Sequence, residues 1–149
     1  MLENILEIDE VDEKILQILK ENSKEKLINI AKRLNIPVST VHNRIKRLEK
    51  DKIINKYTIS LNYKKLGLSI TALILVKYNP DSGISQKDLL STLSKFKYVE
   101  KGFIITGEWD ILLITRFRSM DELSNFILQK LRNIKGVKET YTMVALEES

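Results

Sequence analysis

The spacing of the apolar residues changes near residue 50, and this change constrains the fold of the chain more than any other feature. Up to that point, apolar residues recur three and four positions apart, as they do along one face of an α-helix. Beyond it, short continuous apolar runs alternate with further segments of helical spacing. Such runs are typical of buried strands, so we expect an α+β protein with a helical N-terminal part and a mixed C-terminal part.

Three helices are predicted in the N-terminal part. The first begins after Asp9, whose carboxylate is suited to capping a helix. The second ends at Asn35, and Ile36-Pro37 marks a turn, because proline fixes its own φ and keeps the preceding residue out of the α region. The third spans about Val38–Lys50. Their buried stripes hold, in order, Val11, Ile15, Ile18 and Leu19; Leu27, Ile30, Ala31 and Leu34; and Val41, Ile45 and Leu48.

Charge is distributed unevenly over these helices. Residues 1–21 carry seven acids and two lysines, a net charge of −5, whereas residues 24–56 carry ten bases and three acids, a net charge of +7. One interpretation is a basic face turned to a polyanion, with an acidic helix turned away from it. The other is an ordinary solvated surface of mixed charge.

The third helix favours the first interpretation. Two short helices joined by a tight turn, of which the second is basic, are typical of a helix-turn-helix. On a wheel of about 100° per residue, the side opposite the buried stripe has short polar groups near its N-terminal end and cations further along, as a major-groove recognition helix needs. The predicted DNA-binding residues are Ser39, Thr40, His42, Asn43, Arg44, Lys46, Arg47 and Lys50. Base readout is assigned to Ser39, His42 and Asn43, and phosphate contact to Lys46, Arg47 and Lys50.

The C-terminal part is predicted to be a ferredoxin-like βαββαβ domain. A linker strand is expected over residues 53–61. The domain's own strands are expected at 70–76, 99–106, 111–117 and 137–146. Capping-box patterns, Ser85 with Asp88 and Ser119 with Glu122, open the two helices between them. The predicted division of the chain is therefore a helix-turn-helix domain at 1–52, a β-strand linker at 53–66 and the ferredoxin-like domain at 67–149.

Two strands of this domain, at 70–76 and 111–114, are apolar on both faces. Two helices can cover only one face of a four-stranded sheet, so something else must cover the other. A partner chain is the simplest candidate, and we expect a homodimer. The alternative is that the N-terminal part packs across that face of the sheet.

Composition limits the class of protein. Hydrophobic residues make up 43% of the 149 residues and charged residues 30%, the balance of a globular protein. The chain has no apolar run of about 18 residues and no signal-peptide pattern, so a cytoplasmic location is expected. The absence of cysteine excludes disulfides, thiolate chemistry and zinc fingers. No metal site, cofactor or catalytic residue is predicted.

In six segments spread over nearly its whole length, the chain resembles the Lrp/AsnC, or feast/famine, family of transcription regulators. The segments are VDEKIL (11–16), IAKRLNIP (30–37), NRIKRLEKDKII (43–54), KLGL (65–68), TGEWDILL (106–113) and IKGVKETYT (134–142). The resemblance implies sequence-specific binding of double-stranded DNA and control of transcription. It also implies a dimer that assembles further into a tetramer or octamer, and an amino-acid effector.

The resemblance also implies where the effector binds. In the family it lies between dimers, near the turn matched here by Thr106, Gly107, Glu108, Trp109 and Asp110. Backbone N–H groups and a carboxylate at such a turn suit the two charged groups of an amino acid. The alternative is a plain hairpin turn, in which Gly107 is present for its positive φ.

Two positions depart from the family pattern. The family usually has serine where this chain has Pro37, which cannot accept a capping hydrogen bond, so the cap is expected to shift to Ser39 or to be lost. The usual glycine before the linker strand is Lys52 here, which alters that turn. Both departures leave the fold intact and the preferred DNA sequence open.

Other classes of function are open to a chain of this architecture. Sirohaem decarboxylases resemble this architecture, but their chemistry calls for histidines and arginines around a pocket, and His42 is the single histidine. The sequence has no Ser/His/Asp set, P-loop or metal-ligand cluster, so an enzyme is not expected. A low-specificity architectural DNA-binding protein is the main alternative, because its electrostatics would be similar. A sensor without DNA binding is disfavoured by the basic helix.

Overall fold

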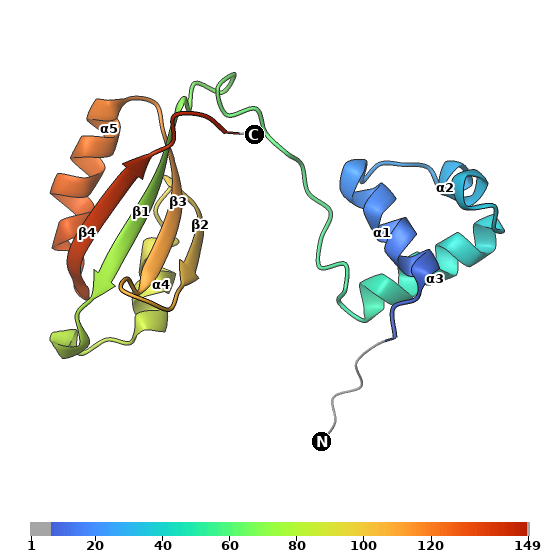
Figure 1. Cartoon of the computed structure of the whole chain (residues 1–149), viewed down its shortest axis with the longest axis horizontal. Coiled ribbons are helices and arrows are strands. Elements are labelled where there is room, and N and C mark those ends of the chain that lie inside the picture. Colours follow the sequence, from blue (N-terminus) through green and yellow to red (C-terminus); the bar gives the residue numbers. More distant parts are fainter. Residues whose placement is uncertain (1–6, 149) are drawn as a thin grey trace. The chain divides into compact units, whose positions relative to one another are not determined.

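A computed structural model describes residues 7–148, and its contacts divide the chain into two units, Met1–Ser60 and Leu61–Ser149 (Figure 1). We call them unit 1 and unit 2. Residues 1–6, where the predicted first domain begins, and residue 149, where the last one ends, lie outside the described residues. The predicted α+β class is confirmed, with helices in unit 1 and a sheet with helices in unit 2. Within residues 7–148, no helix is both long and apolar enough to cross a membrane.

Unit 1 contains the three predicted helices: α1 Glu10–Glu21, α2 Leu27–Leu34 and α3 Val38–Lys50. A capping box formed by Asp9 and Asp12 begins α1, and Asn35 ends α2 in the left-handed conformation with φ 53°. The core between the helices is apolar and closely packed. Its buried residues are Ile15, Ile18, Ile30, Ala31, Val41, Ile45 and Leu48.

The two ends of α3 carry the two departures from the family pattern. Pro37 occupies the N-cap position and provides no side-chain hydrogen bond, so the cap is lost and does not shift to Ser39. Lys52, just after α3, has φ 60°. This left-handed conformation costs a residue with a Cβ about 1–2 kcal/mol, which explains why a glycine suits the position.

The predicted linker strand over residues 53–61 is not formed in the single chain. Its alternating apolar residues Tyr57, Ile59 and Leu61 are 48%, 73% and 44% exposed. A strand exists only when its backbone N–H and C=O groups pair with a neighbour, and the described residues offer none to this segment. The alternation of apolar residues that predicts a strand is therefore present, but the neighbouring strand that it needs is not among the described residues.

Unit 2 has the predicted βαββαβ order. Its main elements are β1 Ile70–Tyr78, α4 Gln86–Leu93, β2 Val99–Ile104, β3 Ile111–Phe117, α5 Met120–Asn125 and β4 Val137–Val144. Short turns of helix lie at Pro80–Ser82 and, extending α5, at Phe126–Lys130 and Leu131–Asn133. The sheet is antiparallel in the order β2-β3-β1-β4, which is the ferredoxin-like arrangement.

The two helix starts differ from each other. Ser85 and Asp88 form the predicted capping box of α4. At α5, the Ser119 hydroxyl accepts the N–H of Glu122, but the Glu122 carboxylate accepts the N–H of Arg118 at 2.7 Å. The second predicted capping box is therefore only half formed, because Glu122 bonds one residue further back along the chain.

The two faces of the sheet in unit 2 have different surroundings. One face packs on the helices and forms the core, with side chains at most 2% exposed: Ala72, Ile74, Val76, Leu89, Leu93, Ile111, Leu113, Phe117, Leu123, Phe126 and Leu131. The opposite face, which we call the open face, is also apolar, and cross-strand pairs such as Leu75 with Leu112 and with Tyr141 lie along it. Its residues are Leu73, Leu75, Phe103, Leu112, Ile114, Tyr141 and Met143. Tyr141 and Met143 are 54% and 38% exposed.

Candidate nucleic-acid interface

The structure divides the predicted DNA-binding residues of α3 into two groups. Val41, Ile45 and Leu48 fix the orientation of the helix, because they are buried against α1 and α2. Five predicted residues are exposed on the side of α3 away from this core: Ser39, His42, Asn43, Lys46 and Lys50. Within residues 7–148 their side chains form no hydrogen bond or ion pair, so their polar groups face solvent.

Arg44 and Arg47, predicted with the same set, lie against α1 instead. Arg44 donates to Asp9 at 2.5 Å and to Asp12 at 3.1 Å, and Arg47 donates to Asp12. Thr40 is half-buried beside them in the helical wheel. The charged ends of both arginines are therefore directed toward the N-terminal end of α1, although the Arg47 side chain remains 45% exposed.

Asp12 is a residue of this region that the sequence prediction did not single out. Its side chain is fully buried and accepts hydrogen bonds from both arginines and from the N–H of Asp9. A signal for it exists in the sequence, because Asp12 precedes the buried Ile15 by one helical turn. A carboxylate on the apolar stripe of a helix needs a cation close by.

Electrostatics keep Asp9 and Arg44 ionised. The hydrogen bond from Arg44, with that from the N–H of Asp12, lowers the pKa of Asp9 to about 2. The same contact with Asp9, followed by that with Asp12, raises the pKa of Arg44. The contact between Asp9 and Arg44 is therefore an ion pair at any ordinary pH.

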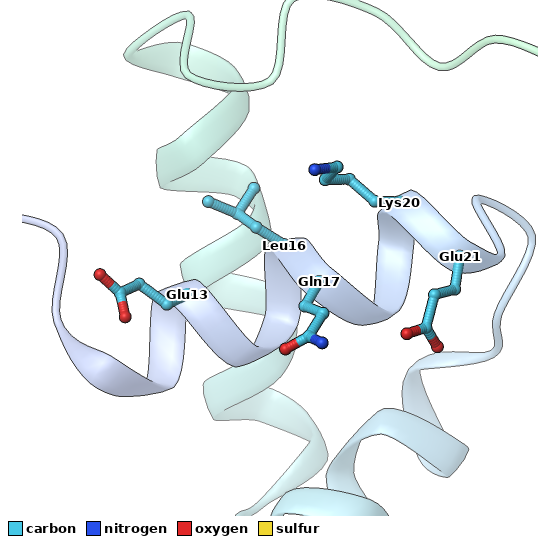
Figure 2. Close-up of a pocket in the computed structure, with 5 residues that line it drawn as sticks. All are labelled: Glu13, Leu16, Gln17, Lys20 and Glu21. Carbon is cyan, nitrogen blue, oxygen red and sulfur yellow. The ribbon is translucent and has the colours of Figure 1, made fainter.

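The other side of α1 carries a shallow hollow of about 570 Å³, shown in Figure 2 with α3 behind the helix. Its lining mixes both signs of charge with one leucine: Glu13, Leu16, Gln17, Lys20 and Glu21. Within residues 7–148, no group of three or more histidine, aspartate or glutamate side chains is arranged to hold a metal ion. None of the predicted site residues lines this hollow.

In unit 2, the predicted effector turn lies between β2 and β3. Gly107 has φ 114°, and Thr106, Gly107 and Glu108 are exposed. The carboxylate of Asp110 accepts the N–H of Tyr78 at 2.8 Å and an N–H of Gln86 at 3.4 Å.

Two further contacts hold this turn against the sheet. Lys77 donates to the carbonyl of Glu108, and the ring of Trp109 lies 6.0 Å from that of Tyr141 on the open face. The five predicted residues are thus contiguous, but Asp110 already has partners within unit 2. Lys77 and Gln86 are neighbours of the turn that the sequence did not indicate.

Comparisons with known proteins cover both units. Residues 8–55 match the family model for winged helix-turn-helix DNA-binding domains, and residues 71–149 match that for the Lrp/AsnC ligand binding domain. A helix-turn-helix-type transcriptional regulator of Pyrococcus furiosus is 46% identical over 138 residues, which are 93% of this chain and 92% of the relative.

Solved structures agree with this match. A transcriptional regulator of Neisseria meningitidis in complex with L-Met has a TM-score of 0.88 and 30% identity, over 95% of this chain and 92% of that one. AsnC of E. coli has a TM-score of 0.84 and 24% identity, over 95% and 94% of the two chains, and shows the same fold.

Proposed function

Because this chain belongs to the Lrp/AsnC family of transcriptional regulators, we propose that it binds its target DNA by placing the exposed side of α3 in the major groove. The protein is a DNA-binding regulator with a ligand-binding domain, and not an enzyme. One observation carries the proposal: five polar or basic side chains on α3 are exposed and have no partner within residues 7–148.

Each of these side chains has a role that fits its chemistry. Ser39, His42 and Asn43 are short and lie toward the N-terminal half of α3, where a recognition helix approaches base edges. Lys46 and Lys50 follow in the C-terminal half and are suited to phosphate contact, which positions the protein but carries no sequence information.

A second copy of the chain completes the DNA-binding form in this proposal. The open face of unit 2 is apolar and partly exposed, which is what an interface between two copies requires. A two-fold dimer would present two α3 helices to successive major grooves about 34–36 Å apart, or a multiple of this distance. Assembly of such dimers into a tetramer or octamer is part of the same proposal.

Substitutions on α3 test its role. Lys46→Ala is expected to weaken binding to all sequences alike and to reduce the slope of log K against log salt by about one unit. Asn43→Ala is expected to change the preferred sequence, because asparagine reads adenine with two hydrogen bonds. Selection of bound DNA fragments, and binding titrations at several salt concentrations, measure both effects. An unchanged consensus for Asn43→Ala contradicts the assignment of the reading face.

The same titrations address the architectural alternative. A regulator that reads sequence binds its selected site about 10³-fold or more tighter than random DNA at the same salt concentration. A ratio near one for the unmodified protein would favour a low-specificity architectural protein, whose affinity comes from phosphate contacts alone.

We also propose that an amino acid modulates the protein at the turn Thr106–Asp110. The Neisseria meningitidis relative is described as a complex with L-Met, and the family model over unit 2 is that of a ligand-binding domain. Exposed backbone at Gly107 offers N–H donors to a carboxylate, and Asp110 offers charge to an ammonium group.

Asp110→Asn tests this site, since it keeps an acceptor for the N–H of Tyr78 but removes the charge. Wild-type protein is expected to change its assembly mass when a mixture of amino acids is added, and the variant is expected not to. Light scattering measures the mass, and an unshifted melting temperature shows that the variant is folded. A full response by the folded variant excludes a role for the Asp110 charge.

A further inference from the structure

The cations of α3 differ in what they contact. Lys46 and Lys50 have no ion-pair partner within residues 7–148, whereas Arg44 and Arg47 both contact Asp12, and Arg44 also contacts Asp9. The two arginines and the two aspartates together carry no net charge. Arg47 is 45% exposed but paired with Asp12, so the unpaired positive charge that α3 offers to DNA is that of its lysines.

Because Asp12 is buried, breaking its ion pairs with Arg44 and Arg47 would cost much free energy. Its side chain is 0% exposed, and both of its oxygens are occupied, Oδ1 by Arg44 and Oδ2 by Arg47 and the N–H of Asp9. A fully buried carboxylate that loses its cations pays the whole cost of removal from water. One phosphate contact at the protein surface contributes much less free energy than this cost, because salt screens it. The equilibrium therefore keeps the arginines on Asp12.

We propose that Asp12 withholds Arg44 and Arg47 from the DNA phosphates and thereby acts as a specificity-determining residue of this regulator. The proposal rests on the proposed role of α3 as the DNA-contacting helix. Phosphate contacts strengthen binding to all sequences alike, whereas base contacts strengthen binding to the right one. Pairing two arginines with aspartates of unit 1 thus lowers the affinity for random DNA and leaves the reading side chains unaffected.

Substitutions at two adjacent residues of α3, one with an ion-pair partner and one without, give the first test. Affinity for a random-sequence duplex is measured for Lys46→Ala and Arg47→Gln between 50 and 200 mM salt. Each phosphate contact contributes about 0.9 to the salt slope, or a change of about 3.5-fold in affinity over this range. Lys46→Ala is expected to lose this contribution, and Arg47→Gln is expected to keep the wild-type slope, since Asp12 retains Arg44.

The pattern of the two results separates the two proposals. A loss of slope in both variants overturns the withholding of Arg47 and leaves α3 as the DNA-contacting helix. No loss of slope in Lys46→Ala removes α3 from the DNA interface, and the role of Asp12 fails with it. A loss in Lys46→Ala alone supports both proposals.

Asp12 itself is tested against a matched control on the same helix. Asp12→Asn keeps the size of the side chain and removes its charge, and Glu13→Gln makes the same change on the exposed side of α1, where Glu13 lines the hollow in Figure 2. Asp12→Asn is expected to steepen the salt slope by about one contact beyond Glu13→Gln, that of Arg47, because Arg44 keeps its ion pair with Asp9. It is also expected to lower the ratio of specific to random affinity. Equal slopes for two folded variants overturn the proposal. If Asp12→Asn does not fold, the comparison of Lys46→Ala with Arg47→Gln decides.

Discussion

Leu48→Ala is expected to unfold unit 1 and abolish DNA binding while unit 2 stays folded. Leu48 is 0% exposed at the centre of the three-helix core, and removing a buried leucine side chain costs about 3–5 kcal/mol. A unit of 60 residues has a free energy of unfolding of roughly 3–9 kcal/mol, so this loss takes away most of its stability. Circular dichroism on heating, with a DNA-binding titration, measures both consequences.

Ile28→Ala provides the control for Leu48→Ala. Ile28 lies on α2 and is 51% exposed, so its truncation is expected to change the free energy of unfolding by about 0.5 kcal/mol or less. A melting temperature for Leu48→Ala equal to that of Ile28→Ala would show that the core of unit 1 does not depend on α3 as described. Retention of the unit 2 transition in both variants distinguishes local unfolding from general loss of the fold.

Leu75→Asp is expected to convert the proposed dimer into monomers. Leu75 lies on the open face, paired across the strands with Leu112 and Tyr141, and a second copy covering this face would bury the new charge without a partner. Losing the second recognition helix removes the gain from two-site binding, so the affinity for a two-half-site operator is expected to fall about 10²-fold or more. Light scattering gives the mass, and a titration gives the affinity.

Leu128→Asp is the matched control, because Leu128 is 50% exposed in the helical extension of α5, on the side of the sheet away from the open face. The same change there is expected to leave mass and DNA affinity as in the wild type. A Leu75→Asp variant that keeps the dimer mass would show that another surface joins the two copies. That result would favour the alternative interpretation, in which unit 1 and not a second copy covers the open face.

Elements with strong local signals could be predicted from the sequence. The bounds of α3 were expected at about 38–50 and those of β3 at 111–117, and both are found there. For α3 the signal is an apolar stripe of helical spacing after a proline turn. For β3 it is a continuous apolar run between two turns. The linker strand over 53–61 could not be predicted correctly, because its formation depends on a neighbouring strand and not on its own pattern.

The candidate interface was predictable only in part, for a related reason. A helical wheel separates the buried stripe of α3 from its opposite side, and the five residues expected there are exposed. It places Arg44 and Arg47 at the flank of the stripe but cannot identify their partners, because Asp9 and Asp12 lie about 35 residues earlier in the chain. At the predicted effector turn, the hydrogen bond that the N–H of Tyr78 donates to Asp110 likewise joins residues 32 positions apart. Such contacts follow from tertiary packing, which local patterns do not encode.

The turn at Lys52, with its left-handed backbone, also shortens the segment that connects unit 1 to unit 2, which we call the tether. The N–H groups of Ile53 and Ile54 both donate to the carbonyl of Leu48, and their side chains pack against the helical core. The tether therefore begins at Asn55 and has six residues before unit 2 starts at Leu61, and within it the Tyr57 hydroxyl donates to Glu49 of α3 at 2.6 Å. Fully extended, it spans roughly 20 Å, the rise of about six base pairs. Operators whose half-sites are displaced by a few base pairs stay within this reach, whereas a displacement by a full helical turn exceeds what one tether can supply.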